Sequence, residues 1–235
     1  APEYTAPERM PVPRLYRVSP LAVLGIVLMS VAMSAQYISL PLYALQQGFT
    51  AAQASGALVV ALMAGALVQY PVGWISDKTD RRYVVIGLGL LTAIAGLWMA
   101  IDTSPSRLVF GFAAVAMGTY PTYSILAAHA NDQLRPGQVV PASGTMVFLL
   151  NIGLLLGTIL GPNAISLFDG RGLQMLFVVV GFGGAVLAFV RRVQESAPEE
   201  TGEAQAMGII GMAQPGVLQA DSWIDENDNN SNADL

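Results

Sequence analysis

Long apolar stretches alternate with short polar turns along the whole middle of this chain. No charged residue occurs from Val18 to Ser76, and later stretches are similarly apolar. A helix needs about 20 apolar residues to cross the hydrocarbon of a bilayer. The pattern therefore predicts an all-α, polytopic membrane protein with six transmembrane helices. The predicted spans are Leu21–Leu45, Ala54–Ser76, Tyr83–Ile101, Leu108–Ala130, Val140–Phe168 and Leu173–Val190.

The two ends of the chain have a different composition from the spans. Residues 1–19 are basic and rich in proline, which predicts a tail or linker without helix at a membrane face. Residues 193–235 contain nine of the sixteen acidic residues and no Lys or Arg. This segment is predicted to be an acidic, disordered tail, so the six-span bundle covers residues 20–192.

Composition supports a membrane protein and excludes several functions. The chain is 54% hydrophobic and 11% charged, with a mean hydropathy of +0.54. Soluble chains carry about 25% charged residues. There is no cysteine, so disulfides and thiolate metal sites are excluded. No nucleophile–base pair, His/acid metal cluster or phosphate-binding loop is evident, and an enzyme, a cofactor, a metal site and a nucleic-acid partner are not expected.

Loop charges predict the orientation of the spans. An even number of spans places both ends of the chain on one side of the membrane. Lys and Arg favour the cytoplasmic side, so the distribution of the eleven basic residues decides which side this is. Nine fall on the side of the termini, namely Arg9, Arg14, Arg17, Lys78, Arg81, Arg82, Arg135, Arg191 and Arg192, against Arg107 and Arg171 on the other side. Both termini are therefore predicted to be cytoplasmic.

The turn between the second and third predicted spans carries the most specific motif. Its sequence is GWISDKTDRR, and it resembles the loop signature of the major facilitator superfamily, G-x-L-A-D-R-x-G-R-R, with Asp80 at the position of the second glycine. The residues that carry the resemblance are Gly73, Asp77, Lys78, Arg81 and Arg82. An ordinary charged stop between two spans would explain the basic residues but not the spacing of Gly73 and Asp77.

The resemblance implies a conformational role for this turn. Asp77 ends a helix, where the dipole disfavours an acid, so a compensating group is expected. The candidates are Arg81, four residues later, and the N-terminus of the fifth span, whose free amides attract carboxylates. In the family this aspartate is thought to meet such a helix end when the cytoplasmic side is closed. Gly73 is expected to allow close helix approach.

Six spans correspond to one half of a major facilitator transporter, which is built of 3+3 inverted repeats. The sequences AHANDQL and PLYALQ, together with the signature turn, resemble the second half of bacterial transporters of the YcaD-like subgroup. The resemblance implies one half of a secondary transporter in the bacterial inner membrane, moving a small solute by alternating access. The implied partners are the lipid bilayer, the N-terminal six-helix half or a second copy, a small-molecule substrate and protons. The alternative is a non-transporting six-span scaffold, or a half-size protein that acts only as a homodimer.

Polar residues inside the spans are the candidates for function, because they are costly in hydrocarbon unless they face a cavity or find partners. The predicted cavity residues are Gln36, Tyr37, Tyr120, Tyr123 and Asn151. Hydrogen bonding between helices is the alternative role for each of them. His129 and Asp132, near the cytoplasmic end of the fourth span, are the candidate proton relay.

The fifth span contains small residues at intervals of four. Gly153, Gly157, Gly161 and Pro162 form GLLLGTILGP, a spacing that lets two membrane helices approach closely. The same run resembles the core of an antiporter motif of the superfamily, which favours export, although Ile165 and Ser166 stand where that motif has glycines. Pro162 removes a backbone donor and is expected to bend the helix.

Overall fold

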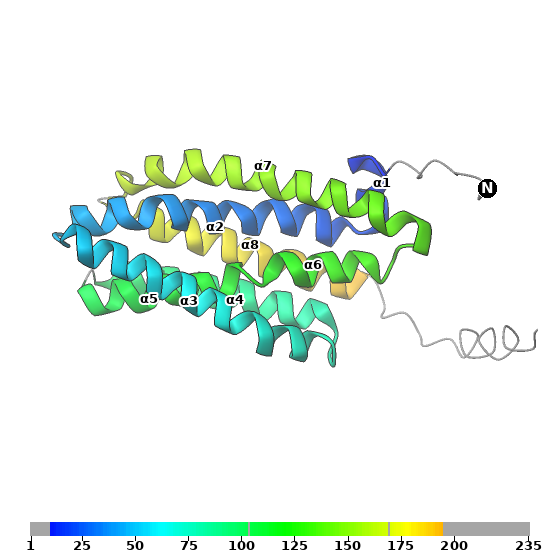
Figure 1. The fold of residues 1–235 in the computed structure, drawn as a ribbon, viewed down its shortest axis with the longest axis horizontal. Helices are drawn as coiled ribbons and strands as arrows, with labels where there is room; N and C mark the ends of the chain where they lie inside the picture. The colour runs from blue at the N-terminus through cyan, green and yellow to red at the C-terminus, as the bar shows by residue number, and fades with distance from the viewer. Residues whose placement is uncertain (1–9, 103, 169, 195–235) are drawn as a thin grey trace, which may run out of the picture. The chain divides into compact units, whose positions relative to one another are not determined.

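The computed structural model describes residues 10–102, 104–168 and 170–194, and within these ranges helices are joined by short turns with no strand (Figure 1). Tail residues 1–9 and 195–235 lie outside the described residues, so the predicted disordered acidic tail is not tested. The helices are α1 (Val12–Val18), α2 (Pro20–Gln46), α3 (Ala51–Ser76), α4 (Arg81–Ile101), α5 (Pro105–Thr119), α6 (Thr122–Asn131), the 3-10 turn η1 (Pro136–Gln138), α7 (Val139–Ile165) and α8 (Gly172–Gln194).

Six helical stretches are long and apolar enough to cross a membrane, which confirms the predicted all-α, six-span fold class. Their mean hydropathies over the most apolar window range from 1.2 to 2.3. The predicted boundaries agree with the helices to within a few residues, and α8 extends to Gln194 rather than ending at Val190.

The fourth span differs from the prediction of one continuous helix over Leu108–Ala130. It is divided into α5 and α6 at Tyr120 and Pro121. Pro121 has no backbone N–H to donate to the preceding turn. The hydroxyl of Thr122 donates a 2.7 Å hydrogen bond to the carbonyl of Gly118, at the end of α5. In contrast, Pro162 lies inside α7 without ending it, so proline alone does not decide where a span is interrupted.

Residues 1–19 were predicted to contain no helix, but part of this segment is helical. Residues 12–18 form α1. Pro11 precedes this helix and Pro13 lies in its first turn, where a missing N–H costs nothing. Leu15 is fully buried, and the hydroxyl of Thr145 in α7 donates a hydrogen bond to the carbonyl of Met10. The segment just before the first span therefore packs against the bundle.

Helix pairing shows an internal symmetry. The most extensive contacts are between α2 and α7 and between α4 and α8, followed by α3 with α5 and α4 with α5, while α2 also contacts α8. In an internal repeat of three spans, α2 corresponds to α5, α3 to α7 and α4 to α8. Under this correspondence the α2–α7 pair becomes the α5–α3 pair, and the α4–α8 pair is unchanged. Each triplet has an odd number of spans, so the two triplets cross in opposite directions. The pairing fits a 3+3 inverted repeat.

Glycines permit the closest of these contacts. A β-carbon at Gly153 or Gly157 of α7 would overlap the backbone carbonyls of Val27 and Val31 in α2. One at Gly161 would lie 2.5 Å from the hydroxyl oxygen of Ser39 and 2.8 Å from the Cα of Ala35. The glycine run of α7 therefore faces α2. The backbones of these two helices touch directly, as the spacing of small residues predicts.

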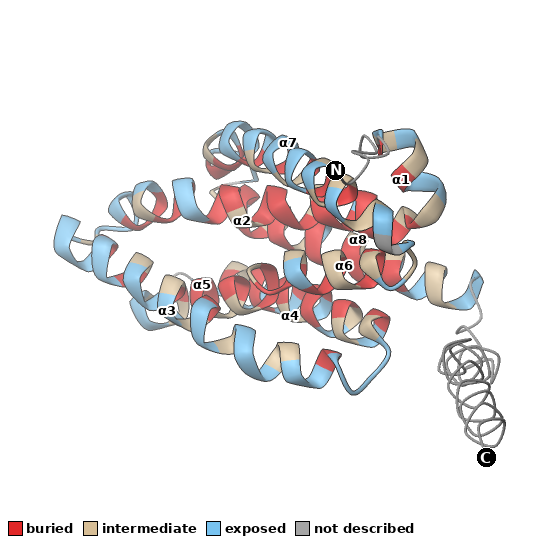
Figure 2. Cartoon of the chain, turned by 45° about the vertical axis from the view of Figure 1, so that its right-hand side comes forward, coloured by how far each residue is buried: buried red, intermediate tan, exposed pale blue. Residues whose placement is uncertain are grey.

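Burial is uneven among the six spans. In the most apolar windows of α3 and α7 only 22% of residues are buried, against 44% to 67% in the other four spans. Figure 2 shows the long exposed faces of α3 and α7. These two helices therefore present most of their apolar side chains outside the bundle.

Candidate functional site

A cavity of about 420 Å³ lies among α2, α3, α7 and the break between α5 and α6. Ser34 and Tyr37 of α2 face Thr158 of α7 and Tyr120 from the interrupted fourth span. The hydroxyls of Ser34 and Thr158 are 2.8 Å apart and hydrogen-bonded. The complete lining is Met33, Ser34, Tyr37, Leu62, Tyr120, Leu154 and Thr158.

The break at Pro121 positions Tyr120 in this cavity. Tyr120 is the C-terminal cap of α5, and its ring packs directly against Gly65 of α3, where a β-carbon would come within 2.6 Å of the ring. Tyr37 is 49% exposed, so the cavity has an accessible aromatic wall. Two tyrosine rings with their hydroxyls, beside two further hydroxyls, suit an amphipathic or aromatic solute that offers hydrogen-bonding groups.

The structure does not bring the five predicted cavity residues together. Tyr37 and Tyr120 line the cavity. Gln36 is fully buried on another face of α2 and donates a 2.9 Å hydrogen bond to the carbonyl of Phe112 in α5. Asn151 is exposed and donates to the carbonyl of Val147 in its own helix.

Tyr123 packs against a buried apolar cluster that includes Leu126 and Met146, and it is not part of the cavity lining. Ser34 and Thr158 were not among the predicted site residues. The signal for Ser34 is its position one helical turn before Tyr37. Thr158 could have been found because it directly follows Gly157, in the run of glycines through which α7 contacts α2.

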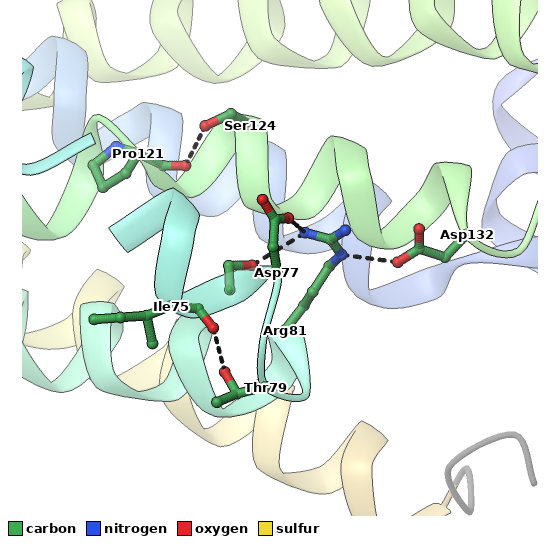
Figure 3. Close-up of polar contacts among 8 residues, drawn as sticks. Ile75, Asp77, Thr79, Arg81, Pro121, Ser124 and Asp132 are labelled. Atoms are coloured by element: carbon green, nitrogen blue, oxygen red, sulfur yellow. Dashed lines mark hydrogen bonds and ion pairs between the residues drawn. The ribbon is translucent and has the colours of Figure 1, made fainter. Parts of the chain in front are cut away.

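The signature turn lies at one end of the bundle and is organised by Arg81, at the start of α4. Its guanidinium donates hydrogen bonds to Asp77 (3.1 Å), Ser76 (3.2 Å) and Asp132 (2.8 Å). Figure 3 shows the guanidinium of Arg81 between the carboxylates of Asp77 and Asp132. The Arg81 side chain is 20% exposed, whereas those of Asp77 and Asp132 are 71% and 58% exposed. We call these four residues the Arg81 cluster. It connects the end of α3, the start of α4 and the end of α6.

The remaining residues of the turn have separate contacts. Asp80 caps α4 by accepting a 2.9 Å hydrogen bond from the backbone N–H of Arg82. Its φ of −59° is ordinary, so this turn does not require glycine at position 80. The ammonium of Lys78 lies 3.7 Å from the ring centre of Trp74, a cation–π contact. Arg82 is buried.

The structure shows which contacts Asp77 and Gly73 make among the described residues. The carboxylate of Asp77 pairs with Arg81, one of its two candidate partners, and has no hydrogen bond to the described N-terminus of α7. A β-carbon at Gly73 would meet no atom within 4 Å, so Gly73 serves no close contact within the described part of this chain. Its open side belongs to the exposed face of α3.

The candidate relay residues lie near each other along α6 but contact different partners. His129 is buried, and its Nε2 lies 3.1 Å from the amide nitrogen of Gln133. Asp132 accepts the hydrogen bond from Arg81. No group of three metal-ligating side chains occurs in the part of the chain that the structure describes.

The fold and this cavity define an integral membrane protein with an inverted-repeat helical bundle. The sequence model of the Major Facilitator Superfamily matches residues 22–223. The chain belongs to this superfamily, whose members are transporters rather than enzymes, and the predicted family assignment is confirmed.

Curated relatives carry the same family name. The chain is 29% identical over 169 residues to the uncharacterized MFS-type transporter YfkF of Bacillus subtilis, which covers 69% of this chain and 42% of the relative. It is 26% identical over 162 residues to the uncharacterized MFS-type transporter YcaD of Salmonella arizonae, again covering 69% of this chain and 42% of the relative. The chain thus spans about two fifths of the length of these relatives.

Proposed function

We propose that this chain supplies one six-helix half of a secondary transporter that moves a small solute by alternating access. The observation that carries the proposal is the Tyr37–Tyr120 cavity, whose lining includes residues of α3 and α7, the two spans with the smallest buried share. Substrate sites of this family lie between two six-helix halves near the middle of the membrane. Tyr120 stands at the interruption of a span, a feature that accompanies binding sites in transporters.

A second six-helix unit would close the open side of the cavity. The exposed faces of α3 and α7 include Leu67, Tyr70 and Trp74 on α3 and Leu155 and Ile159 on α7. The second unit is either an N-terminal half or another copy of this chain. In both cases the cavity wall described above would be one half of the substrate site.

The Arg81 cluster would control the state of the cytoplasmic end, with both termini on that side as the loop charges predict. It holds the α3–α4 turn against the end of α6. A contact worth about 1–3 kcal/mol in only one of two states shifts their ratio roughly 5–150-fold. Asp77 is the most exposed member of the cluster and is the one available to meet a different partner when the bundle moves.

Proton-coupled export completes the proposal. Histidine is the side chain whose ordinary pKa lies nearest to neutral, and His129 is the one histidine of the chain. Asp132, three residues after His129, accepts a hydrogen bond from Arg81. The glycine run of α7 resembles an antiporter motif, which supports the outward direction. A proton gradient would then drive solute movement, and His129→Gln would remove the dependence of flux on that gradient.

The test is solute flux in proteoliposomes that contain the protein together with its second unit. A panel of amphipathic aromatic solutes would be offered with and without a pH gradient. Tyr37→Ala and Tyr120→Ala should each reduce flux at least tenfold, a loss of about 1.4 kcal/mol or more. Phe182→Ala, an exposed aromatic of α8 outside the cavity, is the matched control and should leave flux unchanged. Equal flux in all three variants would contradict the proposed site.

A further inference from the structure

A second and larger concavity lies at the opposite end of the bundle from the Arg81 cluster. It runs along the end of α7, the turn that follows and the start of α8, and its volume is about 680 Å³. We call it the rim groove. Ligand sites in proteins range from about 300 to 1,000 Å³, so the groove is large enough for a ligand. It is lined by Leu160, Asn163, Ala164, Leu167, Phe168, Arg171, Gly172, Met175, Leu176 and Val179.

The lining is apolar except for two side chains. Asn163 uses its amide to donate a 2.7 Å hydrogen bond to the carbonyl of Ile159 in its own helix. Arg171 is exposed, and within the described residues its guanidinium has no hydrogen-bond acceptor or ion pair. Among the described residues that line it, the rim groove is therefore an apolar channel with one cation, Arg171.

The two arginines at this end of the bundle, Arg107 and Arg171, differ in their ion pairing. Arg107 lies 3.8 Å from the carboxylate of Asp102 and stacks over Trp98 at 5.7 Å. Its charge is thus balanced by neighbours in the same chain. Arg171 forms no ion pair among the described residues, so its charge can attract an anion from outside the chain.

The length and position of the groove indicate where that anion comes from. Eight residues separate Arg171 from Val179 in α8, which corresponds to about 12 Å of helix. One leaflet contributes about 15 Å of hydrocarbon, half of a core of about 30 Å. The groove begins at the turn between two spans, at the level of lipid headgroups, and follows α8 through most of one leaflet. Leu167, Phe168 and Val179 along it are exposed.

We propose that the rim groove binds one anionic phospholipid from the adjacent leaflet. The phosphate would accept hydrogen bonds from the guanidinium of Arg171, whose planar set of donors matches phosphate geometry. An acyl chain would lie along Met175, Leu176 and Val179. This inference depends only on the membrane location of the chain and does not depend on the proposed transport function.

The test is competition between two lipids for the intact protein, measured by native mass spectrometry in mild detergent. Phosphatidylglycerol and phosphatidylcholine would be added in equal amounts, and the occupancy of the first bound lipid compared. Near a membrane surface one Lys or Arg favours an anionic lipid by about fivefold. The wild-type protein should therefore prefer phosphatidylglycerol by about this factor, and Arg171→Gln should bring the ratio close to one.

Three further variants make the result specific. Arg171→Lys keeps the charge and should keep most of the preference, while Arg107→Gln removes a charge at the same end and should leave the ratio unchanged. Val179→Trp fills the groove from an exposed position and should lower the first-lipid occupancy for both lipids.

An unchanged ratio in Arg171→Gln, or an equal effect of Arg107→Gln, would overturn the proposal. So would a wild-type protein that binds both lipids equally. If Val179→Trp dissociated a dimer without changing lipid occupancy, the groove would be an interface between copies instead.

Discussion

The Nε of Arg81 donates a 2.8 Å hydrogen bond to a carboxylate oxygen of Asp132, across 51 positions of sequence. This bond ties the turn between the second and third spans to the end of the fourth (Figure 3). It establishes that both loops lie at the same end of the bundle. It also gives the signature turn a partner elsewhere in this chain.

The first prediction concerns the energy of this bond. A double-mutant cycle with Arg81→Gln and Asp132→Asn should give a coupling free energy of about 0.5–1 kcal/mol, since exposed ion pairs contribute little. Arg81→Gln alone should destabilise more than Asp132→Asn, because it also leaves Asp77 without its partner. The measurement is chemical unfolding in detergent at low and high salt, with the coupling reduced by salt.

A control cycle pairs Asp132→Asn with Arg135→Gln, a nearby exposed arginine that has no ion pair with Asp132. Its coupling should be close to zero. Equal coupling free energies in both cycles would mean that any nearby positive charge stabilises Asp132, and that the hydrogen bond from Arg81 adds nothing specific.

The six spans could be predicted from sequence because each one exceeds the length that hydrocarbon requires. The faces of the helices could not be predicted equally well. Membrane helices such as α2 and α7 are apolar on all sides, so no polar stripe fixes their rotation. Gln36 and Tyr37 are adjacent and about 100° apart around the helix, and only Tyr37 reaches the cavity.

The glycine run of α7 indicates which residues of this helix can reach the cavity. Gly153 and Gly157 fix the face of α7 that contacts α2. Asn151 is two residues before Gly153 and therefore about 200° away, on the opposite face. The interruption of the fourth span had a weaker signal, because Pro41, Pro71 and Pro162 all lie within continuous helices. Only the surrounding contacts distinguish Pro121 from them.

The second prediction concerns topology. The chain has no cysteine, so single cysteines can be introduced at Thr79 and Ser104 without removing others. These positions lie in the turns at the two ends of α4. A membrane-impermeant thiol reagent added to intact cells should label Ser104→Cys, and it should label Thr79→Cys only after the membrane is opened. Labelling of both from the same side would contradict the six-span arrangement.

The third prediction concerns the α2–α7 contact. Gly157→Ala places a methyl group against the carbonyl of Val31, so the two backbones must separate. The expected loss is about 1–3 kcal/mol of unfolding free energy, as for overpacked cores. Gly144→Ala, in the same helix but with no atom within 4 Å of the added carbon, should stabilise by about 0.5–1 kcal/mol through helix propensity. Thermal unfolding in detergent would compare the two, and similar shifts would show that α7 does not depend on close approach.

The last prediction separates contacts inside this chain from contacts with a second unit. Gly73 has open space around it and lies on the exposed face of α3 between Tyr70 and Trp74, which are 84% and 56% exposed. Gly73→Leu should therefore leave the unfolding free energy of this chain unchanged within about 0.5 kcal/mol, as for surface substitutions.

If α3 is covered by another six-helix unit, the same leucine should weaken assembly and reduce solute flux, because close approach at Gly73 is lost. Gly87→Leu in α4, which also meets no atom within 4 Å, is the control and should affect neither assembly nor flux. The measurements are co-purification of the two units and flux in proteoliposomes. Normal assembly and flux in Gly73→Leu would show that the exposed face of α3 contacts lipid and that the second unit binds elsewhere.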